Sequence, residues 1–350
     1  MTDALPSLPG RRHEKKFRVL LCLAACWLCA LPFSCLVGPA PVCAGDAARA
    51  LGAVLGLTTP PANEISFLVV GNIRLARAVI AALCGGALAM SGVTLQGVLR
   101  NPLADPFTLG ISAGAACGAS LIISLGTSVP VLPGISQAAL VAPAALAGAL
   151  LALAAAVWLG SAGGLRRESV VLAGIAVSAF LGALVALVKA LNEESVTSIV
   201  FWLLGSLQGR TWESLPILLL TLVPGFFLVG LNFRKLDLLC LGDDEAAQLG
   251  LDVSSARLCL LAGAGLMTAG CVAVTGIIAF VGLVVPHLLR LWLGGTHAPL
   301  LTGAFFGGGL LLTAADTLAR SLPGGQELPV GVVTALLGGP FFALLVRRRG

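Results

Sequence analysis

Long apolar stretches separated by short polar segments run from about residue 17 almost to the end of the chain. A helix needs about 20 consecutive apolar residues to cross a bilayer, and most of these stretches are that long. The predicted spans are 17–37, 68–92, 107–126, 138–160, 169–191, 214–232, 256–275, 278–294, 299–319 and 329–346. The predicted fold class is therefore an all-α polytopic membrane protein of about ten transmembrane helices.

Three connections, 38–67, 192–213 and 233–255, are too long to be simple turns, and we expect the first two to hold short helices along the outer surface. The expected organisation is a cytoplasmic tail, one transmembrane permease domain and a basic tail. Their bounds are 1–16, 17–346 and 347–350.

The first apolar run resembles a signal peptide, because the basic residues Arg11 to Arg18 precede it. However, it reaches from Val19 to about Val37, which is longer than the usual apolar region of 7–15 residues. We interpret it as an uncleaved first span, although the sequence does not decide whether it is ever cleaved.

Composition supports a membrane protein and gives the orientation. Of the 350 residues 58% are apolar and 11% charged, against roughly 25% charged in soluble domains. Fifteen of the 21 basic residues fall on the side of the two termini, and six fall on the other. The positive-inside rule therefore predicts cytoplasmic termini in the inner (plasma) membrane. Because the basic residues lie at the ends of apolar runs, we expect no nucleic-acid partner.

Ten cysteines raise the possibility of a metal site or disulfides. However, Cys22, Cys26 and Cys29 lie inside the first apolar run, and most of the others lie inside later ones. Cysteine at such positions behaves as a small buried apolar residue. We predict no metal site, and we expect Cys43 to lie outside the spans without an obvious partner.

The segment 241–250 is the most informative cytoplasmic connection. Asp243 can cap a short helix, acids follow in its first turn, and Gly250 stands where a left-handed C-terminal residue is favoured. Such a helix is either a solvated turn or a coupling helix that contacts a separate ATPase subunit. The predicted coupling residues are Asp243, Asp244, Glu245, Ala246, Ala247, Gln248, Leu249 and Gly250.

Three arginines fall on the outer side, against the general charge bias. Arg74 and Arg77 lie three residues apart, on one face of the second span, and Arg320 lies at the outer end of the ninth. Exposed arginines there could anchor phospholipid phosphates or bind carboxylates of an external protein. Asp316, one turn before Arg320, could orient it.

Helix-breaking residues mark two further segments. Prolines at 102 and 106 prevent a continuous helix after the second span, and glycines at 110, 114 and 118 form a stripe for close helix packing. A second short stretch of glycine and proline leads to Pro286 and His287, for which we expect a hydrogen-bonded structural histidine. We expect helix packing or pathway roles for Gln96, Asn101, Pro102, Gly110, Gly114 and Pro286.

The sequence lacks the motifs of an energy-transducing or hydrolytic enzyme. It contains neither G-x-x-x-x-G-K-[ST] nor H-E-x-x-H, and no chain of acidic residues crosses its spans. A proton- or sodium-coupled carrier usually has such acids. We therefore expect no bound cofactor, no covalent chemistry and an external source of energy, with an ATPase-independent secondary carrier as the rival.

Several ordered motifs resemble the permeases of binding-protein-dependent ABC importers for iron–siderophore complexes, haem and vitamin B12, the FecCD type of transport permease. The resemblance runs from about residue 65 to the C-terminus. It rests on residues 73–77, 91–106, 109–114, 172–175, 202–207, 241–250, 280–287 and 327–335. The core of the second motif reads Arg-Asn-Pro-Leu-Ala-Asp-Pro. Position 76 departs from the family pattern, being Ala where Pro is frequent, and leaves the arginine spacing intact.

The resemblance implies a fold like that of the vitamin B12 importer permease, with a pathway between paired permeases. The second permease is another copy or a paralogue. It also implies two ABC ATPase subunits that use ATP and magnesium, an external substrate-binding protein and surrounding lipid. By position, 243–250 matches the coupling segment, and Arg74, Arg77 and Arg320 match the docking arginines. A ferric siderophore is the first expectation for the substrate, with a corrinoid or haem as the alternative.

Overall fold

The computed structural model describes residues 9–347 apart from 60, 62, 127–135 and 322–326, and the described part consists of helices joined by turns and loops, without strands. Its α-helices are α1 (Pro9–Leu36), α2 (Ala44–Val54), α3 (Glu64–Leu68), α4 (Leu75–Val98), α5 (Ile111–Leu125), α6 (Gln137–Ser161), α7 (Arg167–Leu191), α8 (Val196–Leu203), α9 (Leu215–Gly230), α10 (Phe233–Leu239), α11 (Asp243–Gln248), α12 (Val253–Thr275), α13 (Val281–Leu293), α14 (His297–Ala319) and α15 (Val330–Arg347). A π-helical turn, η1 (Val69–Arg74), and three 3-10 turns, η2 (Pro106–Leu109), η3 (Glu193–Ser195) and η4 (Trp212–Ser214), complete the described elements.

Ten of these segments correspond in order to the ten predicted spans. Seven are long and apolar enough to cross a bilayer, and three shorter apolar helices, α5, α13 and α15, account for the others. The predicted all-α polytopic fold is confirmed. The second span is longer than predicted, because α3, η1 and α4 form one continuous helix from Glu64 to Val98.

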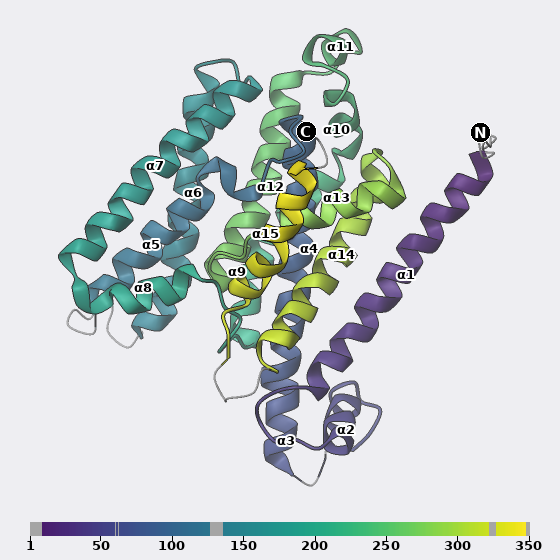
Figure 1. Cartoon of the computed structure of the whole chain (residues 1–350), viewed down its shortest axis with the longest axis vertical. Helices are drawn as coiled ribbons and strands as arrows, with labels where there is room; N and C mark the ends of the chain where they lie inside the picture. The colour runs from purple at the N-terminus through teal and green to yellow at the C-terminus, as the bar shows by residue number, and fades with distance from the viewer. Residues whose placement is uncertain (1–8, 60, 62, 127–135, 322–326, 348–350) are drawn as a thin grey trace.

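The two sides of the membrane domain are distinguished by their short helices. The start of α1, the end of α15 and α11 lie at one end of the molecule, and α2 and α3 lie at the other (Figure 1). The first end carries the predicted cytoplasmic segments. The connection 38–67 holds α2 along the outer side as expected, whereas α3 continues directly into the second span instead of lying along the surface.

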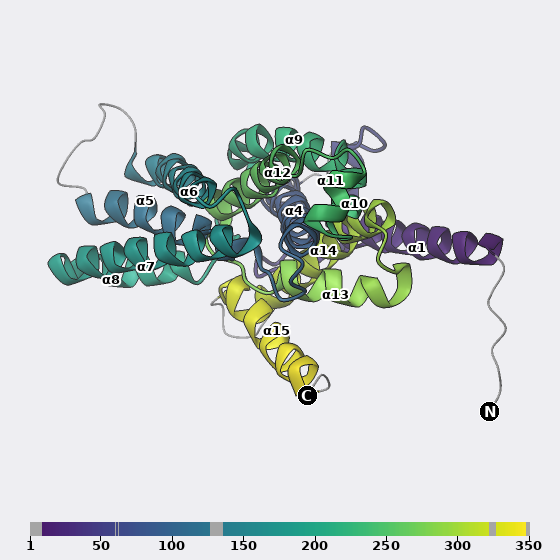
Figure 2. The same ribbon diagram turned by 90° about the horizontal axis from the view of Figure 1, so that it is seen from above.

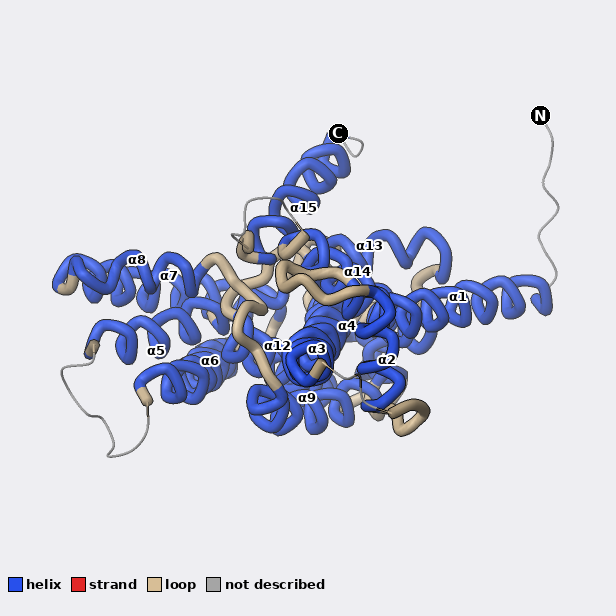
Figure 3. Tube along the Cα trace, turned by 90° about the horizontal axis from the view of Figure 1, so that it is seen from below, coloured by secondary structure: helices blue, strands red, loops and turns tan. Residues whose placement is uncertain are grey.

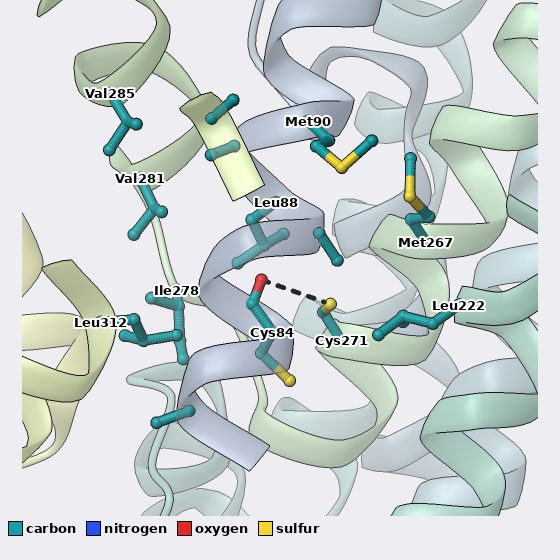
Figure 4. Packing of buried hydrophobic residues seen from close by; sticks show 14 of the residues in the cluster. Cys84, Leu88, Met90, Leu222, Met267, Cys271, Ile278, Val281, Val285 and Leu312 are labelled. Atoms are coloured by element: carbon teal, nitrogen blue, oxygen red, sulfur yellow. Dashed lines mark hydrogen bonds between the residues drawn. The ribbon is translucent and has the colours of Figure 1, made fainter. Parts of the chain in front are cut away.

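Helix α4 lies at the centre, with α12, α13 and α14 around it (Figure 2). Small residues allow close packing there: a Cβ atom added to Gly85 of α4 would lie 2.2 Å from the carbonyl oxygen of Gly308 in α14. In the core beside this contact, the thiol of Cys271 donates a hydrogen bond to the carbonyl oxygen of Cys84 (Figure 4). These two cysteines are buried as expected.

The remaining helices lie to either side of this centre. Seen from below, α5, α6, α7 and α8 lie together on one side of α4, and α1 lies on the other (Figure 3). Cys22, Cys26 and Cys29 of α1 are exposed, so the expectation that they are buried is wrong. They lie on a helix that packs on the rest of the chain with only part of its surface: 11% of its most apolar stretch is buried.

Two loops, one after α8 and one after α12, meet the first turn of α15 near the outer side. The amide of Ser206 donates to the carbonyl of Thr275, and the amide of Gly331 donates to Gly205. Gly205 and Gly276 have φ of 68° and 72°, and a Cβ at Gly331 would lie 2.1 Å from a carbonyl oxygen. Glycine is required here because the three backbones approach too closely for side chains.

Candidate coupling surface and outer arginine cluster

Helix α11 is attached to the membrane domain through its first residue. Asp243 accepts hydrogen bonds from Arg257 of α12 at 2.8 and 2.9 Å and from Arg167, the first residue of α7, at 2.9 Å. Arg257 is almost fully buried, and its other terminal nitrogen donates to the carbonyl of Leu165 at 2.7 Å. One carboxylate therefore joins α11 to two spans and to the connection between α6 and α7.

This arrangement corrects the expectation that Asp243 caps α11. The residue before the helix is Gly242, with φ of 155°, and Asp243 stands inside the first turn with its side chain directed to the two arginines. The C-terminal expectation agrees with the structure. Gly250 has φ of 84°, and the amides of Gly250 and Leu251 donate to Ala247 and Ala246, which ends the helix with a Schellman motif.

The ion pairs also set the protonation of Asp243. Its partial burial favours the neutral acid, but hydrogen bonds from Arg257 and then Arg167, together with their positive charges, outweigh that effect. The pKa of Asp243 is therefore below its ordinary value. The carboxylate is ionised at neutral pH, as the bridge between the two guanidinium groups requires.

The other side of α11 is exposed. Asp244, Glu245, Gln248 and Leu249 are all exposed, and Ala246 is buried against the membrane domain. Leu249 is 62% exposed. The surface combines acidic groups with an apolar residue on a helix held at its N-terminus by ion pairs and closed at its C-terminus by glycine. Such a surface can bind a groove in another protein and move as a rigid unit with it.

The outer arginines form a buried cluster, which we call the outer arginine cluster: Arg74, Arg77 and Arg320 with Asp316 and Glu327. Arg77 donates to both carboxylate oxygens of Asp316, with distances from 2.8 to 3.0 Å, and to Glu327 at 2.6 Å. Arg320 forms a second ion pair with Asp316 at 3.4 Å. The cluster links α4 and α14 to the residues just before α15.

Two of these arginines also hold the end of the first span. Arg74 donates to the carbonyl oxygens of Cys35, at 3.0 Å, and Ala40, at 2.6 Å. Arg320 donates to the carbonyl oxygens of Ser34 and Val37 and to the hydroxyl of Ser34. The guanidinium groups therefore replace the helical partners that the last carbonyls of α1 lack.

The expectation that the three arginines are exposed is wrong: each is 4% exposed. Sequence spacing placed them correctly at the outer side, but it could not show the carbonyl and carboxylate oxygens that α1 and α14 bring to them. Their predicted role in docking a binding protein remains a prediction. Asp316 bridges Arg77 and Arg320, a wider role than the expected orientation of Arg320.

Gln96 is the centre of the predicted corner after α4. Its amide nitrogen donates to the carbonyls of Ala104, at 3.3 Å, and Gly282, at 3.2 Å, and its oxygen accepts from Arg290. A Cβ at Gly92 would lie 1.9 Å from the same carbonyl of Gly282. The corner thus joins α4, the loop before η2 and the start of α13.

The other residues of this predicted set are spread over several elements. Asn101 accepts from the amide of Leu103 at 2.9 Å, and Pro102 beside it is half-buried. Gly110, with φ of 80°, separates η2 from α5. A Cβ at Gly114 would lie 2.3 Å from the carbonyl of Gly148 in α6. Pro286 lies buried inside α13, and the ring of His287 packs on that of Phe341 in α15.

Sequence reasoning missed the partners of Asp243. Arg167 and Arg257 entered the analysis as charges that fix the topology, yet they position the predicted coupling helix. An arginine inside the apolar run 256–275 was the available signal, because a cation there requires a partner. Sequence reasoning also missed a second pair: Nδ1 of His297, at the start of α14, lies 2.5 Å from Oδ1 of Asp237 in α10.

This combination of features defines a multi-pass inner-membrane transport subunit. The described chain has ten apolar helical segments with the buried α4 at their centre, and one cytoplasmic helix is attached by ion pairs and has an exposed acidic side.

Comparison with known proteins gives the family. The chain belongs to the FecCD transport family, whose model matches residues 23–348. It is 42% identical to the hemin transport system permease protein HmuU of Yersinia pestis, over 82% of this chain and 85% of that one. It is 37% identical to the Fe(3+) dicitrate transport system permease protein FecC of Escherichia coli, over 93% of each.

A further relative and a solved structure support the same family. The cobalamin import system permease protein BtuC of Halobacterium salinarum is 40% identical over 82% of this chain and 75% of its own length. A solved structure, an inward-facing conformation of a metal-chelate type ABC transporter, matches with a TM-score of 0.79 and 31% identity, covering 95% of this chain and 99% of that one. The chain is therefore an ABC transporter permease of the metal-chelate, haem and vitamin B12 group.

Proposed function

We propose that this permease carries a metal chelate from outside the cell to the cytoplasm, driven by ATP hydrolysis in partner subunits. A ferric siderophore is the first choice of substrate, and a corrinoid or haem is the alternative. The relatives act in hemin transport, cobalamin import and Fe(3+) dicitrate transport, which supports this class of cargo.

The observation that carries the proposal is the geometry of α11. Its exposed acidic side can bind a groove on an ATPase subunit, and Asp243 transmits displacement of the helix to α7 and α12 through two arginines. A helix held in this way moves with the membrane domain, whereas a flexible loop would absorb the displacement. Closure of the ATPase pair would then shift the paired permeases between outward- and inward-open states.

The proposed assembly contains a second permease (a copy or a paralogue), two ABC ATPase subunits, an external substrate-binding protein and surrounding lipid. ATP and magnesium are used by the ATPase partner. This chain binds no cofactor and performs no covalent chemistry in the proposal. The coupling residues are those of 243–250.

The test is a charge reversal on the exposed side of α11. The double variant Asp244→Arg with Glu245→Arg should abolish co-purification of the ATPase subunit and leave membrane insertion intact. The matched control is Glu193→Arg with Glu194→Arg, which reverses two adjacent exposed acids on the outer side. Retained co-purification in the first variant, at the level of the control, would refute the coupling assignment.

We also propose that the loaded binding protein docks on the outer side above the outer arginine cluster. Because the three guanidinium groups are buried and bind groups of the chain itself, Arg74, Arg77 and Arg320 would act there through their charge and by fixing residues 34–40. Docking should weaken with salt, and Arg74→Gln should reduce both its affinity and its salt dependence. Arg49→Gln, at an exposed outer arginine, is the control. Unchanged affinity of Arg74→Gln at low salt would contradict the role.

The rival is a self-sufficient secondary carrier. It predicts solute accumulation by vesicles that contain this polypeptide alone, without nucleotide. The proposal predicts accumulation only when the ATPase subunits, ATP and the binding protein are present.

A further inference from the structure

Arg210 is partly buried and differs from the buried arginines in the described part of the chain. Arg77 and Arg257 bind carboxylates, and Arg74 binds backbone carbonyls. The Arg210 side chain makes no hydrogen bond or ion pair with the described residues, and its Nε atom is buried without a partner. The segments 127–135 and 322–326, outside the described residues, contain no acidic residue that could pair with it.

Arg210 lines a cavity of about 440 Å³ at the outer ends of α5, α6 and α12, beside α8. Trp202 lines the same cavity, and its indole Nε1 is also buried without a hydrogen-bond partner. Two donors of different type therefore lack an acceptor in one place. The hydroxyl-bearing Ser198 lies in the same lining, and the remaining wall is mostly apolar, including Val141 and Phe201.

A guanidinium group that is partly removed from water without a counter-charge is unfavourable, and its buried Nε donor adds to that cost. Buried donors in folded proteins almost always have partners. An anion in this cavity would provide an acceptor for both Arg210 and Trp202. The planar guanidinium group suits phosphate oxygens, which it can bind through two parallel hydrogen bonds.

We propose that this cavity binds a phosphate group through the side chains of Arg210 and Trp202. The place of the cavity at the outer ends of the spans is the level of phospholipid headgroups, and its apolar wall can receive the first part of an acyl chain. The two sources of the phosphate, a phospholipid headgroup and free inorganic phosphate, share this chemistry, and the experiment separates them.

The experiment measures lipid and phosphate binding to the purified full-length chain by native mass spectrometry and calorimetry. Phosphatidylglycerol is titrated in one arm and inorganic phosphate in the other. Arg210→Gln should weaken binding about tenfold or more, as loss of a charge-assisted hydrogen bond predicts. Trp202→Phe, which removes the indole N–H and keeps an aromatic ring, should weaken it less.

Two further variants keep the test decisive. Arg210→Lys preserves the charge without the planar fork and should bind with intermediate affinity, so it serves if Arg210→Gln does not fold. Arg49→Gln, at an exposed arginine also on the outer side, should bind like the wild type. Loss of phosphatidylglycerol binding in the Arg210 variants identifies a headgroup site, and loss of inorganic phosphate binding alone identifies a free-phosphate site. Equal binding of both ligands to wild type, Arg210→Gln and Trp202→Phe would overturn the proposal.

Discussion

Each side of the membrane domain contains one aspartate paired with two arginines, but the two aspartates differ in their exposure to water. On the outer side Asp316 lies between Arg77 and Arg320, and on the cytoplasmic side Asp243 lies between Arg167 and Arg257. The Asp316 side chain is 1% exposed, whereas that of Asp243 is 33% exposed. The same pairing of one carboxylate with two guanidinium groups is thus closed to water on one side and partly open on the other.

The difference in burial indicates a difference in task. In the outer arginine cluster the donors point inward and connect α4, α14 and the end of α1, so the cluster acts as a fixed structural joint. At α11 Asp243 makes the ion-paired attachment, and the two acids after it are exposed. The cytoplasmic joint can therefore keep its internal contacts while its outer side binds a partner.

The largest effect is expected when the outer joint is broken. Asp316→Asn leaves the buried Arg77 and Arg320 without their shared counter-charge, and breaking such a pair by removing one partner costs about 3–5 kcal/mol. We expect a large fall in the melting temperature of the purified protein in detergent, measured by differential scanning fluorimetry.

The control for this variant is Glu64→Gln, an exposed acid on the outer side. It should change stability by less than about 0.5 kcal/mol, as surface substitutions usually do. If Asp316→Asn is as stable as this control, the outer cluster is not a structural joint, and the comparison between the two sides fails.

A smaller effect on stability, and a larger one on coupling, is expected at the cytoplasmic joint. Asp243→Asn weakens the hydrogen bonds to Arg167 and Arg257, and bonds to charged groups contribute about 1.5–3 kcal/mol, with the lower end expected here because the carboxylate is partly solvated. Transport per ATP hydrolysed should fall in reconstituted vesicles, while the ATPase subunit still co-purifies.

Asp243 is a better residue to substitute than Arg257, because Arg257 also donates a hydrogen bond to the carbonyl of Leu165. Arg257→Gln would also break the bond to the Leu165 carbonyl and leave Asp243 with Arg167 alone, so its loss of activity would mix two causes. An unchanged ratio of transport to ATP hydrolysis in Asp243→Asn would show that α11 transmits displacement by another route.

The hydrophobic pattern was sufficient for the topology because each span is encoded locally. Apolar length gives the ten helical segments, and the basic residues give their direction. Gly250 was predicted from its place after a short helix, and its φ of 84° agrees with that prediction. The second span was predicted as 68–92 and extends from Glu64 to Val98, because polar residues such as Glu64 and Gln96 continue the helix beyond the apolar run.

The environment of charged residues could not be predicted from local sequence. Arg320 is buried by Ser34 and Val37, which are nearly three hundred residues away in the sequence. Asp243 binds Arg167, which is 76 residues earlier, at the start of α7. These contacts depend on how helices pack, and spacing along one helix carries no information about them. The sequence offered one indication of these contacts, because a cation inside or beside an apolar run is unfavourable unless it has a partner.

Gly250 allows a milder change at the end of α11. Its φ of 84° is unfavourable for residues with a Cβ atom, and a left-handed residue other than glycine costs about 1–2 kcal/mol. Gly250→Ala should therefore lower the affinity for the ATPase subunit several-fold by fraying the helix end, as measured by surface plasmon resonance. Gly230→Ala, at the end of α9 and without atoms close to the added methyl group, should not reduce it.

The smallest expected effect is a pH dependence in the stabilisation that the partly exposed cytoplasmic joint provides. Asp243 has a pKa below its ordinary value, because hydrogen bonds from Arg257 and Arg167 outweigh its burial. Its ion pairs therefore stabilise the fold fully at any pH above the unfolded-state pKa of about 3.9, and this contribution is lost as the pH falls through the lower folded-state pKa.

The difference in melting temperature between wild type and Asp243→Asn should be constant from pH 7 to pH 5 and shrink below pH 4. Because both proteins share every other titrating group, including Asp105, whose pKa burial raises to about 6, the difference isolates Asp243. A difference that stays constant down to pH 3 would show that the carboxylate contributes through its shape rather than its charge.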